Sequence, residues 1–164
     1  MSIQSKKKLQ NSLIPKQILF RTFASKLKPS EEAKRVLKIG GKGVKTTFVS
    51  KDLTTNRTGK ENDDVLSTPS MILLMELASV EAIDPFLDKS FATVGFHVNV
   101  KHLARTNKGA TVTTESIIEK IDGSKITLDV KAFEIDGNKK KLIGDGKHRR
   151  AVIKFDDDND KKKN

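Results

Sequence analysis

One segment of the chain is apolar almost all the way round a helix, and it restricts the fold more than any other feature. Thr68 and Pro69 open it well, since Thr is a good N-cap and Pro fits the first helical position. The segment continues through residues 70–83, and Pro85 stops it. A helix that is apolar on nearly all sides is expected to be buried on most of them. The rest of the chain must therefore wrap around this helix.

Four strand-like runs follow the helix. They are separated by turn residues and occupy residues 91–103, 111–121, 125–135 and 141–155. Asp122-Gly123 is a strong hairpin signal between the second and the third run. Residues 44–50 predict one further strand before the helix. A sheet that curls around one apolar helix buries it economically, so we predict an α+β hot-dog fold: an antiparallel sheet wrapped around one long buried helix.

Alternation within the first of these runs separates its two histidines. One face of the run is apolar and contains Val94, Phe96, Val98 and Val100. His102 continues this face, whereas His97 has the opposite parity. A histidine at the end of an inward face is usually a satisfied core or rim residue, and catalysis is the alternative.

Glu76 is the residue that the apolar helix accommodates least well. Its neighbours on the helix surface are Ile72, Leu73, Ser79 and Val80. An ionised carboxylate there needs partners, unless Glu76 occupies a narrow exposed stripe and is ordinary surface. Thr68 is explained as an N-cap, yet a helix N-terminus also offers free N–H groups to a developing oxyanion. The helix would then hold a hydroxyl at its mouth and a carboxylate about two turns deeper.

Composition excludes several kinds of site. The chain has no cysteine, which rules out disulfides, thiolate nucleophiles and Cys-based metal sites. Its three histidines are not spaced as ligands, so we expect no metal site. No run of apolar residues is long enough to predict a membrane span.

The basic excess of the chain belongs mainly to its N-terminus. The formal net charge is +11, and residues 1–30 hold seven Lys and Arg without any acid. We therefore expect no nucleic-acid partner, because such binding needs a folded basic patch with interleaved aromatic residues. The acid-free, hydroxyl-containing residues 1–28 are typical of a mitochondrial transit peptide, and a basic tail on a cytoplasmic protein is the alternative. We expect the folded domain at 29–155 and a charged tail at 156–164.

Three segments of the chain resemble the fluoroacetyl-CoA thioesterase-like family of hot-dog proteins. Residues 65–76 (VLSTPSMILLME) resemble its nucleophile-helix signature, residues 93–104 (TVGFHVNVKHLA) its second motif, and residues 144–152 (GDGKHRRAV) its closing strand. The spacing between Thr, Glu and His is kept. Two departures occur: His148-Arg149-Arg150 replaces the usual His-Glu-Arg, and Phe96 stands where the family often has a small hydroxyl residue.

The resemblance implies an acyl-CoA thioesterase with a catalytic set of Thr68, Glu76 and His102. It places the matching glycine at Gly95 and the matching arginine at Arg150, as substrate-binding positions. It also implies a homodimer with CoA lying across each active site near the subunit interface, and no cofactor. Residues 61–64 are polar, so the resemblance does not extend to a lid that selects a fluorinated acyl group. The identity of the acyl group is therefore not predicted.

We therefore predict hydrolysis of a small acyl-CoA to the free acid and CoA, with Glu76 as general base or nucleophile. Arg150, Lys101 and Arg105 could contact the CoA phosphates, and plain surface charge is the alternative for the last two. A non-catalytic acyl-CoA-binding hot-dog domain is the main alternative and predicts binding without turnover. A hot-dog hydratase would need an Asp and a His close together near the helix, a pattern that the chain lacks.

Overall fold

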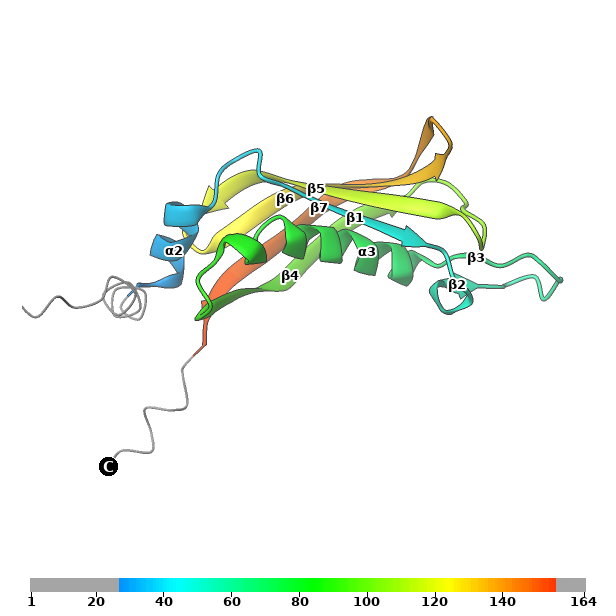
Figure 1. Ribbon diagram of the computed structural model, residues 1–164. Helices are drawn as coiled ribbons and strands as arrows, with labels where there is room; N and C mark the ends of the chain where they lie inside the picture. The colour runs from blue at the N-terminus through cyan, green and yellow to red at the C-terminus, as the bar shows by residue number, and fades with distance from the viewer. Residues whose placement is uncertain (1–26, 156–164) are drawn as a thin grey trace, which may run out of the picture.

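A computed structural model describes residues 27–155 of the chain (Figure 1). Its main elements are α2 (Pro29–Val36), β1 (Lys42–Phe48), α3 (Thr68–Glu81), β4 (Phe91–His102), β5 (Thr111–Asp122), β6 (Lys125–Asp136) and β7 (Lys139–Lys154). Shorter ones are η1 (Lys51–Leu53), β2 (Thr54–Thr55), β3 (Val65–Leu66) and η2 (Asp84–Phe86). The predicted leader, apart from its last two residues, and the predicted charged tail lie outside the described residues.

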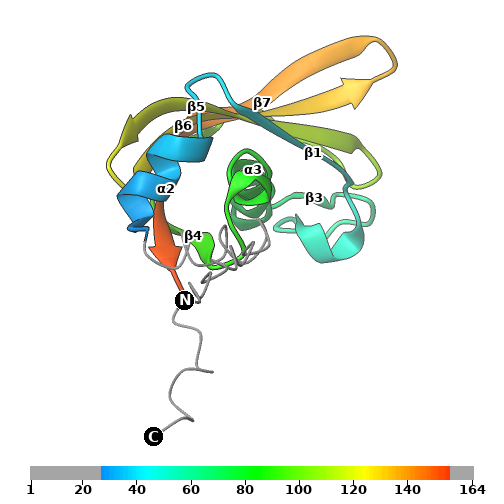
Figure 2. The ribbon, with the colours of Figure 1, turned by 60° about the vertical axis from the view of Figure 1, so that its left-hand side comes forward.

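The five long strands form one antiparallel sheet in the order β1-β5-β6-β7-β4. Figure 2 shows the sheet curving over α3, which lies in its hollow, with α2 at one end. This arrangement confirms the predicted α+β fold, an antiparallel sheet around one long helix. Among the helices described between residues 27 and 155, none has the length and apolar character to cross a membrane.

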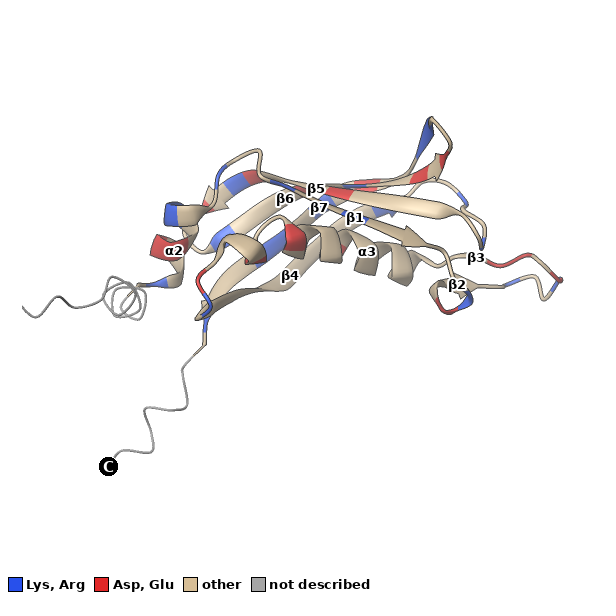
Figure 3. Cartoon of the chain, in the orientation of Figure 1, with Lys and Arg blue, Asp and Glu red and all other residues tan. Residues whose placement is uncertain are grey.

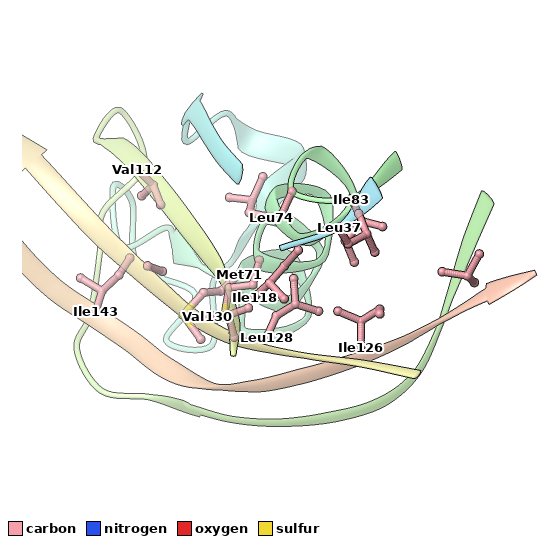
Figure 4. Packing of buried hydrophobic residues seen from close by; sticks show 14 of the residues in the cluster. Leu37, Met71, Leu74, Ile83, Val112, Ile118, Ile126, Leu128, Val130 and Ile143 are labelled. Carbon is pink, nitrogen blue, oxygen red and sulfur yellow. The ribbon is translucent and has the colours of Figure 1, made fainter. Parts of the chain in front are cut away.

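The core lies between α3 and the concave face of the sheet (Figure 4). Met71, Leu74 and Met75 of α3 are buried. They pack in one cluster with side chains from β4, β5, β6 and β7, including Phe91, Val112, Ile118, Ile126, Leu128, Val130 and Ile143. Burying a side chain of this kind contributes about 1.5–3 kcal/mol, so this contact is the main source of stability for the fold.

The helix is buried on most of its sides but not on all of them. Leu73 and Leu77, which lie on the side of α3 away from the sheet, are exposed. The prediction of a helix buried on most sides therefore holds, and one apolar side of α3 is left open in the protomer. The apolar character of α3 exceeds what one sheet can cover, which leaves apolar surface for another contact.

The helix begins one residue earlier than the sequence suggested. Ser67 is the N-cap, and its hydroxyl accepts a hydrogen bond of 3.2 Å from the Ser70 N–H. Thr68 is already the first helical residue, so the predicted capping role of Thr68 is wrong. The physical reason is that either of two adjacent hydroxyl residues can cap a helix, and here Ser67 has the extended backbone that a cap requires. The hydroxyl of Thr68 is left available for another partner.

A β-bulge in β4 reverses the side-chain alternation that the sequence predicted. Gly95 pairs with Arg150, but His97 pairs with Arg149, so Phe96 is an extra residue in the strand. Residues paired across an antiparallel ladder share a face. Strict alternation predicted that Val94 and Phe96 share the face of Val98. That prediction is wrong, because the extra residue shifts the alternation. Instead, Gly95 shares the helix-facing side with His102, which keeps the face predicted for it.

Candidate active site

The first part of the site is a hydrogen bond between the start of α3 and the end of β4. The Thr68 hydroxyl and Nδ1 of His102 lie 3.0 Å apart. The other ring nitrogen of His102, Nε2, is buried and has no hydrogen-bond partner within residues 27–155. Buried polar atoms are nearly always paired, so an unpaired ring nitrogen indicates a place for a ligand or water. We call Thr68 and His102 the hydroxyl–imidazole pair.

The second part is an ion pair in the middle of α3. Most of α3 carries no charge (Figure 3), and Glu76, the acidic residue in its middle, accepts a hydrogen bond of 3.0 Å from Nη1 of Arg150. The Arg150 side chain is 5% exposed and that of Glu76 is 38% exposed. Glu76 is therefore neither deep in the core nor on an open surface stripe. It lies at the rim of the hollow, held by a buried cation.

Arg150 is fixed by further hydrogen bonds. Its Nε donates to the Thr93 hydroxyl at 2.8 Å, and its Nη2 donates to the Thr93 carbonyl at 2.9 Å. The Thr93 hydroxyl in turn donates to the carboxylate of Asp84. The guanidinium thus has partners on three of its nitrogen atoms and cannot move without breaking them. Because Arg150 is buried in this network, a role in binding the exposed CoA phosphates does not fit it.

Gly95 supplies the wall opposite this ion pair. A Cβ on Gly95 would lie 2.8 Å from Oε1 of Glu76, 2.9 Å from Nε2 of His148 and 3.5 Å from Nη1 of Arg150. Real Cβ atoms do not come within 3.0 Å of other atoms, so any residue but glycine would displace the Glu76 and His148 side chains, whereas 3.5 Å to Arg150 is an ordinary contact. We call Glu76, Arg150, His148 and Gly95 the carboxylate cluster.

His148 is the member of this cluster that sequence reasoning did not single out as a site residue. It shares the inward face of β7 with Arg150 and Val152, and this parity could have identified it. Its side chain is buried, and neither ring nitrogen has a hydrogen-bond partner within the described residues. Burial is the main cause that lowers the pKa of His148. The nearby Arg150 and His97 act in the same direction, and Glu76 opposes them. The imidazole is therefore neutral at physiological pH.

The predicted catalytic residues fall into two places in the protomer. Thr68 and His102 are in contact, but Glu76 lies eight positions after Thr68 on the helix, which is about 12 Å along the axis. No hydrogen bond joins Glu76 to either of them in the described part of the chain, and Glu76 pairs with Arg150 instead. The catalytic roles of all three stay predictions. Within the protomer, the hydroxyl–imidazole pair and the carboxylate cluster are two separate parts of the predicted catalytic set.

The two other predicted contacts for CoA differ in their surroundings. Arg105 donates to the Asn107 side chain at 2.9 Å and pairs with Asp63, so it helps to fix its own loop. Lys101 is exposed near the end of β4. Within residues 27–155, no group of three or more His, Asp and Glu side chains could hold a metal ion.

Comparisons with known proteins identify a family for this chain. A family model described as "Fluoroacetyl-CoA-specific thioesterase" matches residues 49–156. A curated fluoroacetyl-CoA thioesterase of Streptantibioticus cattleyicolor is 37% identical over 93 residues, which cover 57% of this chain and 64% of that protein. The chain thus spans less than two thirds of this relative's length.

Solved structures give the same result for the fold. A structure of the fluoroacetyl-CoA thioesterase FlK has 30% identity and a TM-score of 0.62, and the match covers 76% of this chain and 94% of that one. A Thermus thermophilus protein described as a thioesterase superfamily member has 27% identity and a TM-score of 0.64, over 73% and 86% of the two chains. These similarities confirm the hot-dog fold.

Proposed function

Because the chain belongs to the fluoroacetyl-CoA-specific thioesterase family, we propose that it hydrolyses a small acyl-CoA to the free acid and CoA. One observation carries the proposal. The apolar helix α3 holds the Glu76 carboxylate at the rim of the core, paired to the buried Arg150 and facing the bare backbone of Gly95. A carboxylate held in a fixed place by a buried cation is what thioester hydrolysis requires, as a general base or as a nucleophile.

The hydroxyl–imidazole pair supplies the second half of the proposed chemistry. The Thr68 hydroxyl orients His102 through Nδ1, so that Nε2 faces the reaction. His102 polarises the thioester carbonyl or assists proton transfer to the departing thiolate, and N–H groups at the start of α3 stabilise the oxyanion. Gly95 and Arg150 bind the reacting end of the substrate. Glu76 either activates water or attacks the carbonyl carbon to form an anhydride, which water then opens.

We further propose a homodimer that brings the two halves together. β4 is an edge strand of the sheet, and its Val94, Phe96 and Val98 are all exposed. An unpaired strand edge with apolar side chains is a template for pairing with another chain. Together with the exposed Leu73 on α3, this surface fits a second copy of the protein better than water.

The direction of β4 explains how such a pairing completes the site. The strand runs antiparallel to α3, so His102 lies at one end of β4, beside Thr68, and Gly95 lies near its middle, beside Glu76. Two β4 strands related by a twofold axis near Val98 would place the partner's His102 opposite Gly95. The partner's hydroxyl–imidazole pair would then face this chain's carboxylate cluster, with CoA across the boundary.

We propose only that the acyl group of the substrate is small, and do not assign its identity. The curated relative acts on fluoroacetyl-CoA according to its name, and that specificity belongs to the relative. Phe96 departs from the family pattern, and the bulge directs it away from the helix, where Arg149 lies 5.2 Å from the centre of its ring. We propose that Phe96 shapes the site through the dimer contact, and that Lys101 rather than Arg105 meets the CoA phosphates.

Release of CoA thiol from a panel of short-chain acyl-CoAs tests the proposal. The full chain is compared with Glu76→Gln, His102→Ala and, as a matched control, Glu81→Gln. Glu81 lies on the same helix but is exposed, and among residues 27–155 its ion-pair partner is Lys45, 3.9 Å away. We expect Glu76→Gln and His102→Ala to lose about a hundredfold in kcat/KM or more, and Glu81→Gln to match the wild type. Equal turnover by all four proteins would contradict the assignment, and CoA binding without turnover would favour the non-catalytic alternative.

We also propose that the protein is mitochondrial. The support is the basic, acid-free composition of residues 1–28, and cytoplasmic localisation is the alternative. Mass spectrometry of the mature N-terminus tests it, since import predicts cleavage near Phe23-Ala24. An intact N-terminus on the protein isolated from cells would contradict it.

A further inference from the structure

The imidazole of His148 is buried without any partner for its two ring nitrogens. It lies on the central part of β7, between Val98 of β4 and Leu128 of β6, and its side chain is 2% exposed. Neither nitrogen forms a hydrogen bond within residues 27–155. Buried polar groups in folded proteins are nearly always paired. Two unpaired nitrogens on one imidazole therefore indicate that a ligand or water forms a hydrogen bond with it.

One of these nitrogens and the carboxylate of Glu76 lie beside the same glycine. Nε2 of His148 lies 2.9 Å from the place where a Cβ of Gly95 would be, and Oε1 of Glu76 lies 2.8 Å from the same place. Nη1 of Arg150 is 3.5 Å from it. Three polar atoms from two elements thus converge on the bare side of one glycine. The two side chains paired with each other are Glu76 and Arg150, which leaves His148 as the unpaired member.

The charges around His148 suit a small neutral ligand. The Arg150 cation and His97 on the neighbouring strand oppose a positive charge on the imidazole, and the Glu76 carboxylate favours one. A neutral imidazole has one donor and one acceptor nitrogen, and can exchange a hydrogen bond with water in either direction. A water molecule that bridged the two side chains would donate to the Glu76 carboxylate while Nε2 held it. A carbonyl oxygen, which only accepts, would be repelled by the carboxylate at that position.

We propose that His148 is a further catalytic residue of this site and that it holds the hydrolytic water against Glu76. The proposal rests on the thioesterase function proposed above, with Glu76 as general base. Glu76 takes one proton from the water, and the water oxygen bonds to the thioester carbon. The C–S bond then breaks, and the departing thiolate receives that proton, so that one acyl-CoA and one water give one carboxylic acid and one CoA thiol.

Three variants of the full chain separate this role from a structural one. His148→Leu removes both nitrogens but keeps an apolar side chain. His148→Gln can place an amide near the position of Nε2, whereas the shorter His148→Asn reaches only the region of Nδ1. Removing a buried polar group that has no protein partner is nearly neutral for folding, so all three variants should keep the wild-type far-UV circular dichroism.

We expect His148→Leu and His148→Asn to lower kcat about thirtyfold or more while KM changes less than about threefold, since water and not acyl-CoA is what they fail to hold. His148→Gln should recover at least about a third of the wild-type kcat, because its amide restores a contact near Nε2. A purely structural role predicts no such difference between Gln and Asn.

Two results would overturn the proposal. One is wild-type kcat in folded His148→Leu. The other is a parallel loss in all three variants that follows their loss of folded protein. Glu76→Gln, measured beside them, distinguishes the two levels of failure. If Glu76→Gln also retains wild-type turnover, the proposed function has failed; if Glu76→Gln is inactive and His148→Leu is fully active, only the role of His148 has failed.

Discussion

The hydroxyl of Thr68 and Nδ1 of His102 lie 3.0 Å apart, although the two residues are 34 positions apart in the chain. The bond joins the first residue of α3 to the last residue of β4 and occupies one ring nitrogen of His102. The other nitrogen is left buried and unpaired in the described part of the chain. Thr68 therefore acts on the orientation of an imidazole, while its neighbour Ser67 caps the helix.

Because Thr68 contacts His102 and Ser67 caps the helix, substitution of Thr68 should affect kcat and substitution of Ser67 should affect stability. Thr68→Ala should lower kcat about tenfold or more, because His102 loses its orienting partner, while the free energy of unfolding stays within about 0.5 kcal/mol of wild type. Ser67→Ala should lower that free energy by about 1 kcal/mol, because the helix loses its cap, with little change in kcat. Urea denaturation and thiol-release kinetics on both variants check this. A larger stability loss for Thr68→Ala than for Ser67→Ala would contradict it.

Gly95 and Gly43 offer a second matched pair. Gly95→Ala should reduce turnover about a hundredfold, because the new methyl group displaces Glu76 Oε1 and His148 Nε2, yet stability should change little since both are side-chain ends. At Gly43 a Cβ would lie 2.1 Å from the Ala78 carbonyl oxygen and 2.4 Å from the Ala82 nitrogen, backbone atoms of the last turn of α3 and of its C-cap. Gly43→Ala should therefore lower the thermal midpoint strongly, because β1 and α3 must separate.

Kinetics and thermal unfolding of the two glycine variants give the comparison. Wild-type turnover in Gly95→Ala would show that the ion pair does not depend on the bare backbone of β4. A thermal midpoint near the wild-type value for Gly43→Ala would contradict the close packing of β1 on α3.

His148 makes stability depend on pH in a definite direction. Folding lowers its pKa, chiefly through burial, so the unfolded chain binds more protons than the folded protein once the pH falls below about 6.5. This contribution to the free energy of unfolding is fully present above that pH and is lost as the pH falls through the folded-state pKa. The carboxyl groups of Asp63, Asp64, Asp88 and Glu115, whose pKa values are lowered mainly by hydrogen bonds, act at more acidic pH.

Urea denaturation of wild type and His148→Leu between about pH 7.5 and pH 5.5 isolates the imidazole from those carboxyl groups. We expect the wild-type free energy of unfolding to fall over this range and the variant to fall less. Parallel curves for the two proteins would show that His148 is not responsible.

The sequence was sufficient for the helix and the strands because their periodicity is set by burial against one core. It also placed His102 on the helix-facing side of β4. It failed where a local choice between near-equal options decides the outcome. Ser67 and Thr68 are both capable caps, and strict alternation in residues 91–103 hides the bulge at Phe96, which moves Gly95 onto the face of His102.

The relation between the predicted catalytic residues was beyond reach for a different reason. The spacing of Thr68 and Glu76 fixes their separation along a helix, but not which of them contacts His102. Nor does it reveal Arg150, 74 positions away, as the partner of Glu76. Parity along β7 could have placed His148 on the inward face, but only the structure shows that its buried ring nitrogens lack hydrogen-bond partners within residues 27–155.

A mixed dimer tests most directly whether one reaction centre is assembled from the hydroxyl–imidazole pair of one protomer and the carboxylate cluster of the other. Glu76→Gln and His102→Ala chains are co-expressed with different affinity tags, and the heterodimer is isolated by two successive purifications. Shared sites leave one of its two centres intact, so it should recover about half of the wild-type activity per dimer, although each parent homodimer is inactive. A heterodimer no more active than the parents would contradict the shared site.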